Sequence, residues 1–314
     1  MAGALAAASD AVDPIIVGPA GLDTQGLQRL EAHDVIAMDE KPSDAVRAKP
    51  TSSLVVACKA VAEGKADAVV SAGNTGAMLA ACLLEIRRLP GVRRPAIAVT
   101  IPARRGPSVL LDSGANADAR PEDLVQFAHM GAVFAEDILG VSEPTVRLLS
   151  IGEEPEKGNQ LTREAHELLQ ASDLNFGGNT EGRDLLVGAG DVIVTDGFTG
   201  NVTLKLLEGT IRTVLDAFRE EITASAPGRL GGLLIRPAAR RLRARLDPDT
   251  YGGAYLLGLR GLAVIAHGNS SRRAIENAVR LAARGVEKDV VGRLAQRIDA
   301  TVLASRPSTT PTPT

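Results

Sequence analysis

The chain has no tryptophan, two cysteines, and only five phenylalanines and two tyrosines among its 314 residues. So few aromatic rings leave little surface on which bases could stack, and the net charge of −3 supplies no excess of cations, so nucleic-acid binding is not expected. Two cysteines cannot build a disulfide framework or a thiolate metal cluster. We therefore expect a reducing, cytoplasmic location and no metal site.

Long apolar runs and a charged leader are missing as well. The first 28 residues contain no Lys or Arg, so the Ala-rich start lacks the positive region of a signal peptide. The longest apolar candidate, residues 68–84, is interrupted by the string SAGNTG. The sequence therefore predicts a soluble protein.

Short β-branched runs recur along the chain, and helical periodicity separates most of them. They are PIIVG (14–18), AVVS (68–71), AIAVTI (96–101), SVLLD (108–112), VRLLSI (146–151), DVIVT (191–195) and LAVIAH (262–267). Because these runs are continuously apolar rather than alternating, they indicate strands covered on both faces, as in parallel sheets flanked by helices. We therefore expect an α/β fold.

Two stretches depart from this alternation. Residues 219–247 carry no strand signal, contain two prolines and end in an Arg-rich run, so we expect a helical excursion at about 212–250. The end of the chain is polar and proline-rich, which predicts a disordered tail over 303–314. Residues 15–302 then form one α/β domain.

The loops that follow the predicted strands share Gly, Ser, Thr and Asn. They are SAGNTG (71–76), DSGANAD (112–118), IGEEPEKGN (151–159), TDGFTGN (195–201) and HGNSS (267–271). Such loops bring backbone amides and helix N-termini to an anion, and we expect all five at the same end of the strands. None has the P-loop or dinucleotide spacing, so no nucleotide cofactor is indicated.

Two of these units resemble each other. GKADAVVSAGNTG (64–76) aligns without gaps to GAGDVIVTDGFTG (188–200). Duplication and convergence of two strand-turn-helix units explain the match equally well. In either case, the two helix N-termini are expected to face one cleft.

Several polar residues in these loops are candidates for chemistry. Lys157 could neutralise a phosphate or a developing oxyanion, and Asn201 could donate its amide to the same oxygen. His267 ends a strand and could donate a proton to a leaving group. The structural alternatives are a solvated lysine, a helix cap and a structural histidine. Cys58 and Cys82 lie in apolar helical stretches, so the nucleophile should come from a substrate.

Arginines gather in two places. Residues 87–105 hold one cluster that includes Arg93 and Arg94, and residues 229–245 hold another that includes Arg229, Arg236 and Arg240. The second cluster is mixed with Leu233, Leu234 and Ile235, which suits an acidic protein partner or an anionic membrane surface. The structural alternative is a solvated charged face.

A series of unusual motifs runs in order over roughly residues 35–290. They are MDEKPSDAVRAK (38–49), GKADAVVSAGNTGA (64–77), LLDSGANAD (110–118), IGEEPEKGN (151–159), NTEGRD (179–184), DGFTGNVTLK (196–205), LDPDTYGGAYLLGLRG (246–261) and HGNSS (267–271). Together they resemble the bacterial phosphate acyltransferases of the PlsX family.

The resemblance implies an enzyme that transfers a fatty acyl group from acyl-[acyl carrier protein] to inorganic phosphate, giving acyl phosphate for phospholipid synthesis. It also implies a homodimer without a cofactor, built as an α/β/α sandwich with a mostly parallel central sheet, related to phosphotransacetylases and isopropylmalate dehydrogenases. A protruding helical hairpin, at residues 219–247 here, would make peripheral contact with the membrane.

By the same resemblance, Lys157 and Asn201 match catalytic positions. His267 is a third catalytic candidate because of its place at the end of a strand. The residues expected to bind phosphate or substrate are Gly73, Asn74, Thr75, Gly76, Asp112, Asn116, Asp196, Gly197 and Gly200. The two arginine clusters would contact the carrier protein or the membrane.

One departure concerns the start of the chain. Members of the family open with a strand followed by Asp-Ala-Met-Gly-Gly-Asp, and residues 1–14 do not match it. Either the start lies too far downstream, or the first strand and its loop are lost. The alternatives are therefore an acyl-CoA phosphotransacetylase of the same fold and an inactive homologue that binds the carrier protein or the membrane.

Overall fold

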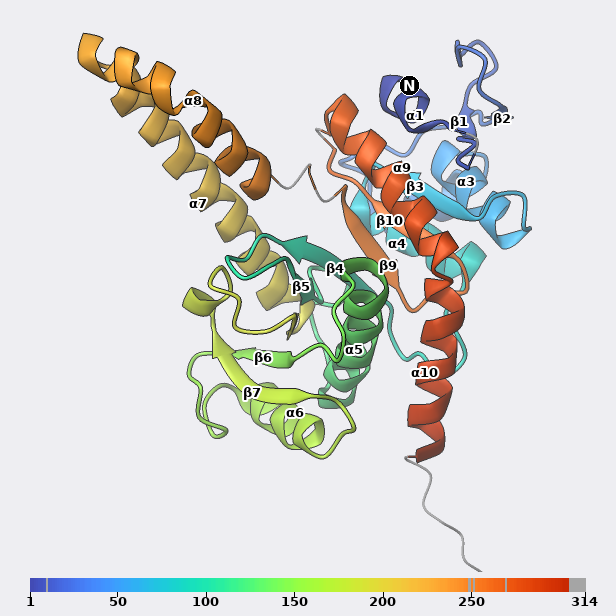
Figure 1. The fold of residues 1–314 in the computed structure, drawn as a ribbon. Helices are drawn as coiled ribbons and strands as arrows, with labels where there is room; N and C mark the ends of the chain where they lie inside the picture. The colour runs from blue at the N-terminus through green and yellow to red at the C-terminus, as the bar shows by residue number, and fades with distance from the viewer. Residues whose placement is uncertain (10, 248–249, 251, 269, 305–314) are drawn as a thin grey trace, which may run out of the picture.

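The computed structural model describes residues 1–9, 11–247, 250, 252–268 and 270–304 (Figure 1). Its main feature is an eight-stranded sheet in the order β3-β10-β9-β4-β5-β8-β6-β7. The strands are β3 (Ala68–Ser71), β4 (Ala96–Ile101), β5 (Ser108–Leu111), β6 (Val146–Ser150), β7 (Phe176–Glu181), β8 (Val192–Val194), β9 (Ala254–Leu257) and β10 (Leu262–Ile265).

The sheet is parallel at both ends and antiparallel in the middle. β3 pairs parallel with β10, and β5, β8, β6 and β7 are parallel neighbours. Between these groups, β9 and β4 form antiparallel pairs with each other and with β10 and β5. The strands of one group consequently run opposite to those of the other.

This reversal corrects one expectation. β3 and β10 run opposite to β5, β6 and β8, so the loops after these strands leave the sheet at two different edges, not at one. The reversal occurs at the antiparallel pair of β4 and β5. The four-residue β9, which the sequence did not reveal, pairs antiparallel with both β10 and β4 and so leaves these two strands running in the same direction.

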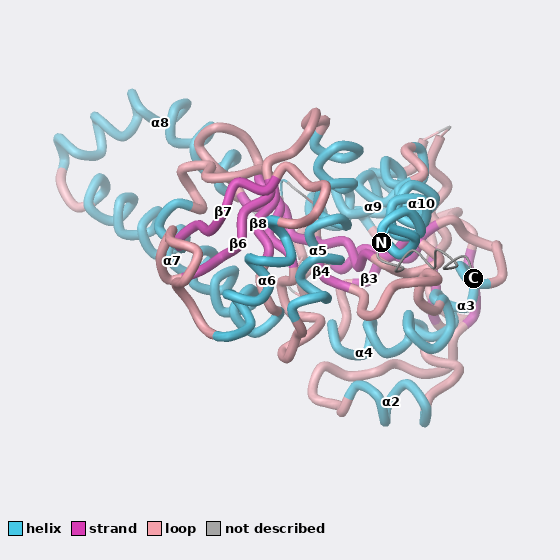
Figure 2. The backbone as a smooth tube through the Cα atoms, turned by 90° about the horizontal axis from the view of Figure 1, so that it is seen from below, coloured by secondary structure: helices cyan, strands magenta, loops and turns pink. Residues whose placement is uncertain are grey.

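Helices cover both faces of the sheet, as Figure 2 shows. The helices are α1 (Ala2–Ala7), α2 (Pro42–Ala48), α3 (Ser53–Ala62), α4 (Thr75–Ala81), α5 (Pro121–Phe134), α6 (Gln160–Gln170), α7 (Gly197–Thr223), α8 (Ala226–Leu246), α9 (Arg272–Glu287) and α10 (Val290–Ala304). Helix α4 continues into η1 (Cys82–Ile86), α5 continues into η2 (Ala135–Leu139), and η3 (Gly182–Asp184) follows β7.

The buried side chains form three clusters that follow the alternation of the strands. Val109 and Leu111 of β5 belong to the largest cluster, with Phe127 of α5. Leu110, between them, points to the opposite face and joins a small cluster against α7. A third cluster lies under α3 and α4 on that same face. One face therefore has a continuous core, whereas the core of the other face is divided.

The N-terminal part of the chain lies outside the main sheet. β1 (Ile16–Gly18) and β2 (Arg29–Glu31) form a separate parallel pair. Helix α1 packs closely against α9, since a Cβ added to Gly3 would lie 2.6 Å from the Arg272 carbonyl oxygen and 2.7 Å from the Ile275 Cβ. Family members begin with a strand, whereas residues 2–7 of this chain form a helix.

Helices α7 and α8 form the predicted protruding hairpin, which extends away from the sheet in Figure 1. Within the described ranges, no helix has a stretch long and apolar enough to cross a membrane. Helix α10 reaches Ala304, so the first two residues of the predicted tail are helical, and residues 305–314 lie outside the described part of the chain.

The first turn of α7 is fixed to the loop that follows β5. The buried Asp112 carboxylate accepts hydrogen bonds from the backbone amides of Ile97 (2.9 Å), Gly114 (3.1 Å) and Asn116 (2.7 Å). The carbonyl of Asn116 in turn accepts from the Gly197 amide at 2.8 Å. The loop and the helix are therefore joined through backbone atoms.

Two glycines make this close approach possible. A Cβ on Gly197 would lie 2.6 Å from the Asn116 carbonyl oxygen, and one on Gly200 would lie 1.9 Å from the Asp112 carbonyl oxygen. Both contacts are with backbone, which cannot rotate away as a side chain can. Glycine is required at both positions for packing.

We predict that Gly200→Ala destabilises the protein by about 3 kcal/mol, because the added methyl group must displace the loop after β5. Gly209→Ala in the same helix is the matched control, since a Cβ there meets nothing within 4 Å. It should stabilise the protein by about 0.5–1 kcal/mol through its higher helix propensity. Thermal unfolding of both variants measures the difference, and equal stability would contradict the packing role of Gly200.

Candidate active site

A cavity of about 440 Å³ opens where the divided core leaves a gap between α4 and α7. Its floor is β4, whose alternate residues Ile97, Val99 and Ile101 line it. Ile97 belongs to the cluster under α4, and Ile101 to the cluster under α7. The cavity therefore lies at the boundary between the two smaller clusters, within the 300–1,000 Å³ range typical of ligand sites.

Helix α7 contributes two rows of side chains to this cavity. Asn201, Lys205 and Glu208 form a polar row, and Leu204, Leu207 and Ile211 form an apolar row. Both rows follow the three- and four-residue spacing of one helix face. The cavity is consequently polar along one side of α7 and apolar along the other.

One end of the cavity is formed by the loop after β5. Ser113 and Gly114 line it beside Asn201. Gly114 has a φ of +136°, and a Cβ there would lie 3.3 Å from the Asn201 Nδ2. A side chain at position 114 would therefore crowd the Asn201 amide, which this glycine leaves room for.

The charged groups in the cavity are not equivalent. His267 Nε2 and Glu208 Oε1 lie 3.1 Å apart. The hydrogen bond from His267 lowers the pKa of Glu208, against the opposing effect of burial. Lys205 also lines the cavity, and no ion pair involves it among the described residues. Lys205 is exposed, and its charge contributes to lowering the pKa of Glu208 without a contact close enough to be an ion pair.

Five of the predicted site residues come together here. Gly73, Thr75 and Gly76, at the start of α4, line the cavity together with Asn201 and His267. The expectation that the starts of α4 and α7 border one cleft agrees with this arrangement. The two units lie on opposite walls because β3 and β8 run in opposite directions.

Other predicted residues serve the surrounding structure. Asn74 caps α4 by accepting from the Ala77 amide at 3.1 Å, and its Nδ2 donates to the carbonyl of Met38 at 3.1 Å. Asp196 caps α7 by accepting from the amide (2.8 Å) and hydroxyl (2.7 Å) of Thr199.

The remaining group lies behind the cavity wall. Asp112, Asn116, Gly197 and Gly200 make the contacts between loop and helix described above, and Asn116 Nδ2 also donates to Asp112 Oδ2 at 2.8 Å. Burial raises the pKa of Asp112, while its hydrogen-bond donors oppose this shift. These residues hold the wall in place, and they are not among the described residues that line the cavity.

Lys157 is exposed and lies outside the cavity as the described residues define it. Its loop follows β6 and is held by three hydrogen bonds. The Lys157 amide donates to the Glu154 carbonyl (3.0 Å), Ser150 Oγ donates to the Lys157 carbonyl (3.2 Å), and Asn179 Nδ2 donates to the Glu154 carbonyl (2.9 Å). Asn179 is itself hydrogen-bonded to the buried His166 at 2.9 Å.

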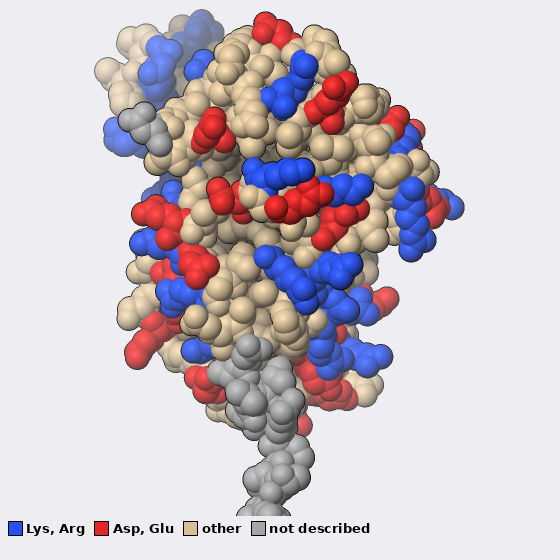
Figure 3. Space-filling model, turned by 90° about the vertical axis from the view of Figure 1, so that its right-hand side faces the viewer, with Lys and Arg blue, Asp and Glu red and all other residues tan. Residues whose placement is uncertain are grey.

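The two arginine clusters differ in their surroundings. Arg93 pairs with Glu122 (3.2 Å) and Asp123 (3.0 Å), and Arg94 lies 3.9 Å from Asp123. Figure 3 shows a similar mixing of basic and acidic side chains over one face of the molecule. This first cluster is therefore partly neutralised within the chain.

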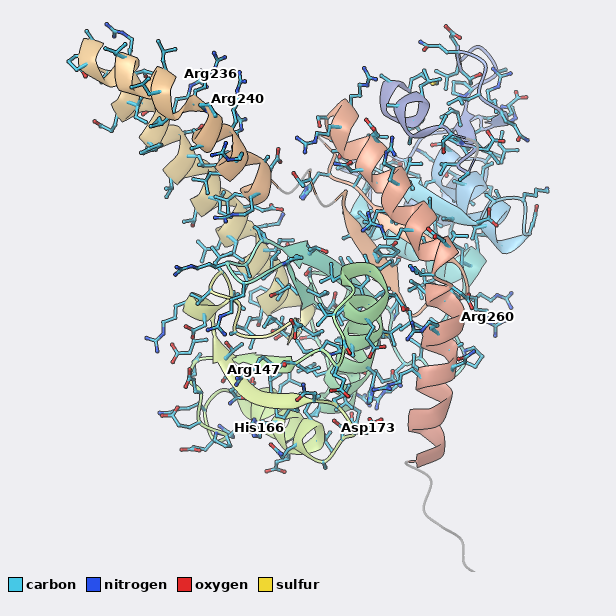
Figure 4. All side chains as sticks on the ribbon, in the orientation of Figure 1. Arg147, His166, Asp173, Arg236, Arg240 and Arg260 are labelled. Atoms are coloured by element: carbon cyan, nitrogen blue, oxygen red, sulfur yellow. The ribbon has the colours of Figure 1, made fainter. Side chains whose placement is uncertain are left out.

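The second cluster lies on α8 and projects from the molecule. Figure 4 shows Arg236 and Arg240 on the hairpin, remote from the sheet. Leu233 is 65% exposed, Leu234 79% and Ile235 41%, although each is apolar. Arg229 donates to the Thr223 carbonyl at 3.1 Å, where the two helices of the hairpin join.

Lys205 and Glu208 were not singled out from the sequence. They follow Asn201 by four and seven residues, so they share its face of the helix. This four- and seven-residue spacing is the sequence signal that could have identified Lys205 and Glu208. The spacing becomes informative only when it is known that this face of α7 lines the cavity.

The cysteines and the possible metal ligands contribute no reactive centre here. Cys58 and Cys82 are buried with their Sγ atoms 3.7 Å apart, and the hydrogen bond between them, together with burial, raises the pKa of the Cys82 thiol. Searching the described residues finds no group of three His, Cys, Asp or Glu side chains arranged to hold a metal ion.

Known structures share this fold. The chain superposes on a phosphotransacetylase from Streptococcus pyogenes with a TM-score of 0.60 and 18% identity, covering 91% of this chain and 92% of that one. A phosphotransacetylase from Staphylococcus aureus gives a TM-score of 0.57 at 16% identity, covering 91% and 89%. At this level of identity the likeness supports the α/β/α sandwich alone, and with the sheet pairing above it confirms the expected fold class.

Sequence relatives are much closer. A phosphate acyltransferase of Heliobacterium modesticaldum is 45% identical over 93% of this chain and 88% of its own length. One from Desulfitobacterium hafniense is 48% identical over 85% and 80%. The model of the family described as fatty acid synthesis protein matches residues 4–293. The chain therefore belongs to the fatty acid synthesis protein family, together with these phosphate acyltransferases, and is an acyltransferase.

Proposed function

We propose that this acyltransferase moves a fatty acyl group from acyl-[acyl carrier protein] to inorganic phosphate and so supplies acyl phosphate for phospholipid synthesis. The observation that carries the proposal is the cavity, which combines a lysine, an asparagine amide and an apolar wall. The lysine would neutralise a phosphate ion, the asparagine amide would donate a hydrogen bond to a thioester carbonyl, and the apolar wall would contact an acyl chain. The names of the relatives support phosphate as the acceptor.

The reaction needs no covalent acyl-enzyme. A phosphate oxygen attacks the thioester carbonyl carbon, forming the C–O bond, and the tetrahedral oxyanion then collapses with cleavage of the C–S bond. The Asn201 amide donates to the oxyanion, and His267, held by Glu208, gives a proton to the departing thiolate. The buried cysteines support a nucleophile that comes from the substrate.

Lys205 holds the phosphate in this scheme. A multiply charged anion enters a partly enclosed cavity at a tolerable free energy only when a cation accompanies it. Lys205 meets that need because Glu208, its nearest acidic neighbour on the polar row, is hydrogen-bonded to His267. Gly73 and Thr75, at the start of α4, line the same cavity.

The donor assay tests the proposed function directly. Purified protein incubated with phosphate and long-chain acyl-[acyl carrier protein] should form acyl phosphate, measured as hydroxamate after trapping with hydroxylamine. Product from acetyl-CoA alone would assign an acyl-CoA phosphotransacetylase instead. Absence of product with both donors would favour the inactive, binding homologue.

We predict that Lys205→Met raises the KM for phosphate and lowers kcat/KM for phosphate by about 10²-fold, because one charge-assisted contact to the reacting anion is lost. Arg219→Met is the control, since Arg219 is exposed further along the same helix and is not among the described residues that line the cavity. An unchanged KM for phosphate in Lys205→Met would contradict the assignment.

Lys157 stays a predicted catalytic residue on the strength of the family resemblance. If it acts on phosphate or the oxyanion, Lys157→Ala lowers kcat by about 10²- to 10³-fold and leaves thermal unfolding unchanged. Full activity in Lys157→Ala alongside loss in Lys205→Met would assign the role to the helix residue alone.

We also infer that the hairpin gives a cytoplasmic protein peripheral contact with the membrane. Exposed leucines beside Arg236 and Arg240 provide apolar anchors and charges for anionic headgroups. The predicted homodimer stays a prediction. An exposed stripe of Phe198, Val202 and Leu206 on α7, with four-residue spacing, is the surface that a second copy would cover.

Replacing Leu233, Leu234 and Ile235 with serine should abolish co-sedimentation with phosphatidylglycerol vesicles, because the apolar anchors are removed from the hairpin. Serine at Leu83 and Leu84, exposed on η1, is the control and should leave binding unchanged. Undiminished sedimentation of the triple variant would refute the hairpin as the membrane contact.

A further inference from the structure

We propose that the apolar side of the cavity is the acyl-chain site, with the chain lying on β4 along the apolar row of α7 and its methyl end at the base of the hairpin. The inference rests on the proposed function, because it takes the acyl donor as the occupant. It adds where the chain lies and which residue sets the accepted chain length.

The floor of this site is β4. Val99 and Ile101 line the cavity from the same face of the strand as Ile97. With a rise of about 3.3 Å per residue, the distance from Ile97 to Ile101 is about 13 Å. Ile97 is 4% and Ile101 2% exposed, so the floor is fixed in the core rather than free to move into the cavity.

The roof is the apolar row of α7. Leu204 and Leu207 line the cavity and also pack against the buried cluster that contains Ile101. They therefore join the roof to the floor along one side. The row continues to Ile211, which lies about 15 Å beyond Asn201 along the helix axis.

The distribution of polar and apolar residues in the cavity determines which way the acyl chain lies. Asn201 lies beside Gly114 at one end, where the thioester carbonyl is placed by the proposed reaction. The last charged side chain of α7 to line the cavity is Glu208, which is bonded to His267. Beyond it come Ile211, Leu246 and Pro102. The carbonyl therefore lies between Asn201 and His267, where the proposed reaction requires both side chains, and the methyl end lies beside Ile211.

Leu246 places the Ile211 end of the cavity at the base of the hairpin. It is the last residue of α8, so the base of the hairpin closes the cavity beside Ile211. Ile211 and Leu246 are both only partly buried by the protein. A bound acyl chain would cover their remaining exposed apolar surface. The side chain at position 211 is accordingly the residue that limits chain length.

The chain-length profile tests the proposal. We measure kcat/KM with saturated acyl-[acyl carrier protein] donors of increasing length for the wild type and three variants. Ile211→Trp should move the optimum to shorter chains, with a loss of about fourfold for each methylene that no longer finds apolar contact. Ile211→Ala should move it to longer chains. Thr210→Trp, exposed on the adjacent face of the same turn, should keep the wild-type profile.

Two outcomes would overturn the proposal. A wild-type profile in both Ile211 variants means that the chain lies elsewhere. A decrease in kcat/KM that is equal at every chain length in Ile211→Trp means that this part of the cavity holds the carrier-linked part of the donor, beyond the thioester sulfur, rather than its acyl chain.

Binding of a long-chain fatty acid, followed by calorimetry, separates this inference from the proposed function. Weaker binding by Ile211→Trp than by Thr210→Trp supports the acyl site even if no acyl phosphate forms. Equal binding by both variants, with acyl phosphate formed normally, overturns the acyl site and leaves the reaction intact.

Discussion

The active-site wall depends on one buried carboxylate. Asp112 accepts backbone hydrogen bonds from β4 and from its own loop, and it positions the loop carbonyls on which the first turn of α7 rests. Without these acceptors several backbone amides would be buried and unpaired, each at a cost of about 1–3 kcal/mol. The cavity-lining residues of α7 keep fixed positions relative to the loop because they are carried by a helix whose start is fixed in this way. Asp112 is thus essential to the site although it does not line the cavity.

The cavity itself results from the reversal of the sheet. A wholly parallel sheet buries both faces continuously, whereas here β9 and β4 join two parallel groups that run in opposite directions. On one face α5 covers the junction, and the core remains continuous. On the other face α4 and α7 belong to different groups, and the core divides above β4. Ligand sites in α/β sheets occur where the strand order switches. The divided core above β4 corresponds to such a switch point in this protein.

The sequence predicted what depends on local pattern. The continuous apolar runs located seven strands, and the long helical periodicity located α7. β7 and β9 were missed because FGGNTE contains two glycines and AYLL is short and bounded by glycines, so neither pattern distinguishes a strand. Among the residues that line the cavity, Asn201 and His267 could be proposed from the sequence because each directly follows a strand-end motif. Lys205 could not be assigned, because its role depends on which face of α7 meets the sheet.

Helix α7 connects the chemistry to the surface of the molecule. Its first turn is fixed to the Asp112 loop, its next three turns line the cavity, and its remainder carries exposed apolar residues, including Val214 and Phe218, into the hairpin. An acyl phosphate has a charged head and an apolar tail, and the cavity presents matching groups in that order along the helix. A product held this way has its tail at the base of the hairpin that carries the exposed leucines. In the proposed complex, the same helix therefore directs the product's tail toward the element proposed to meet the membrane.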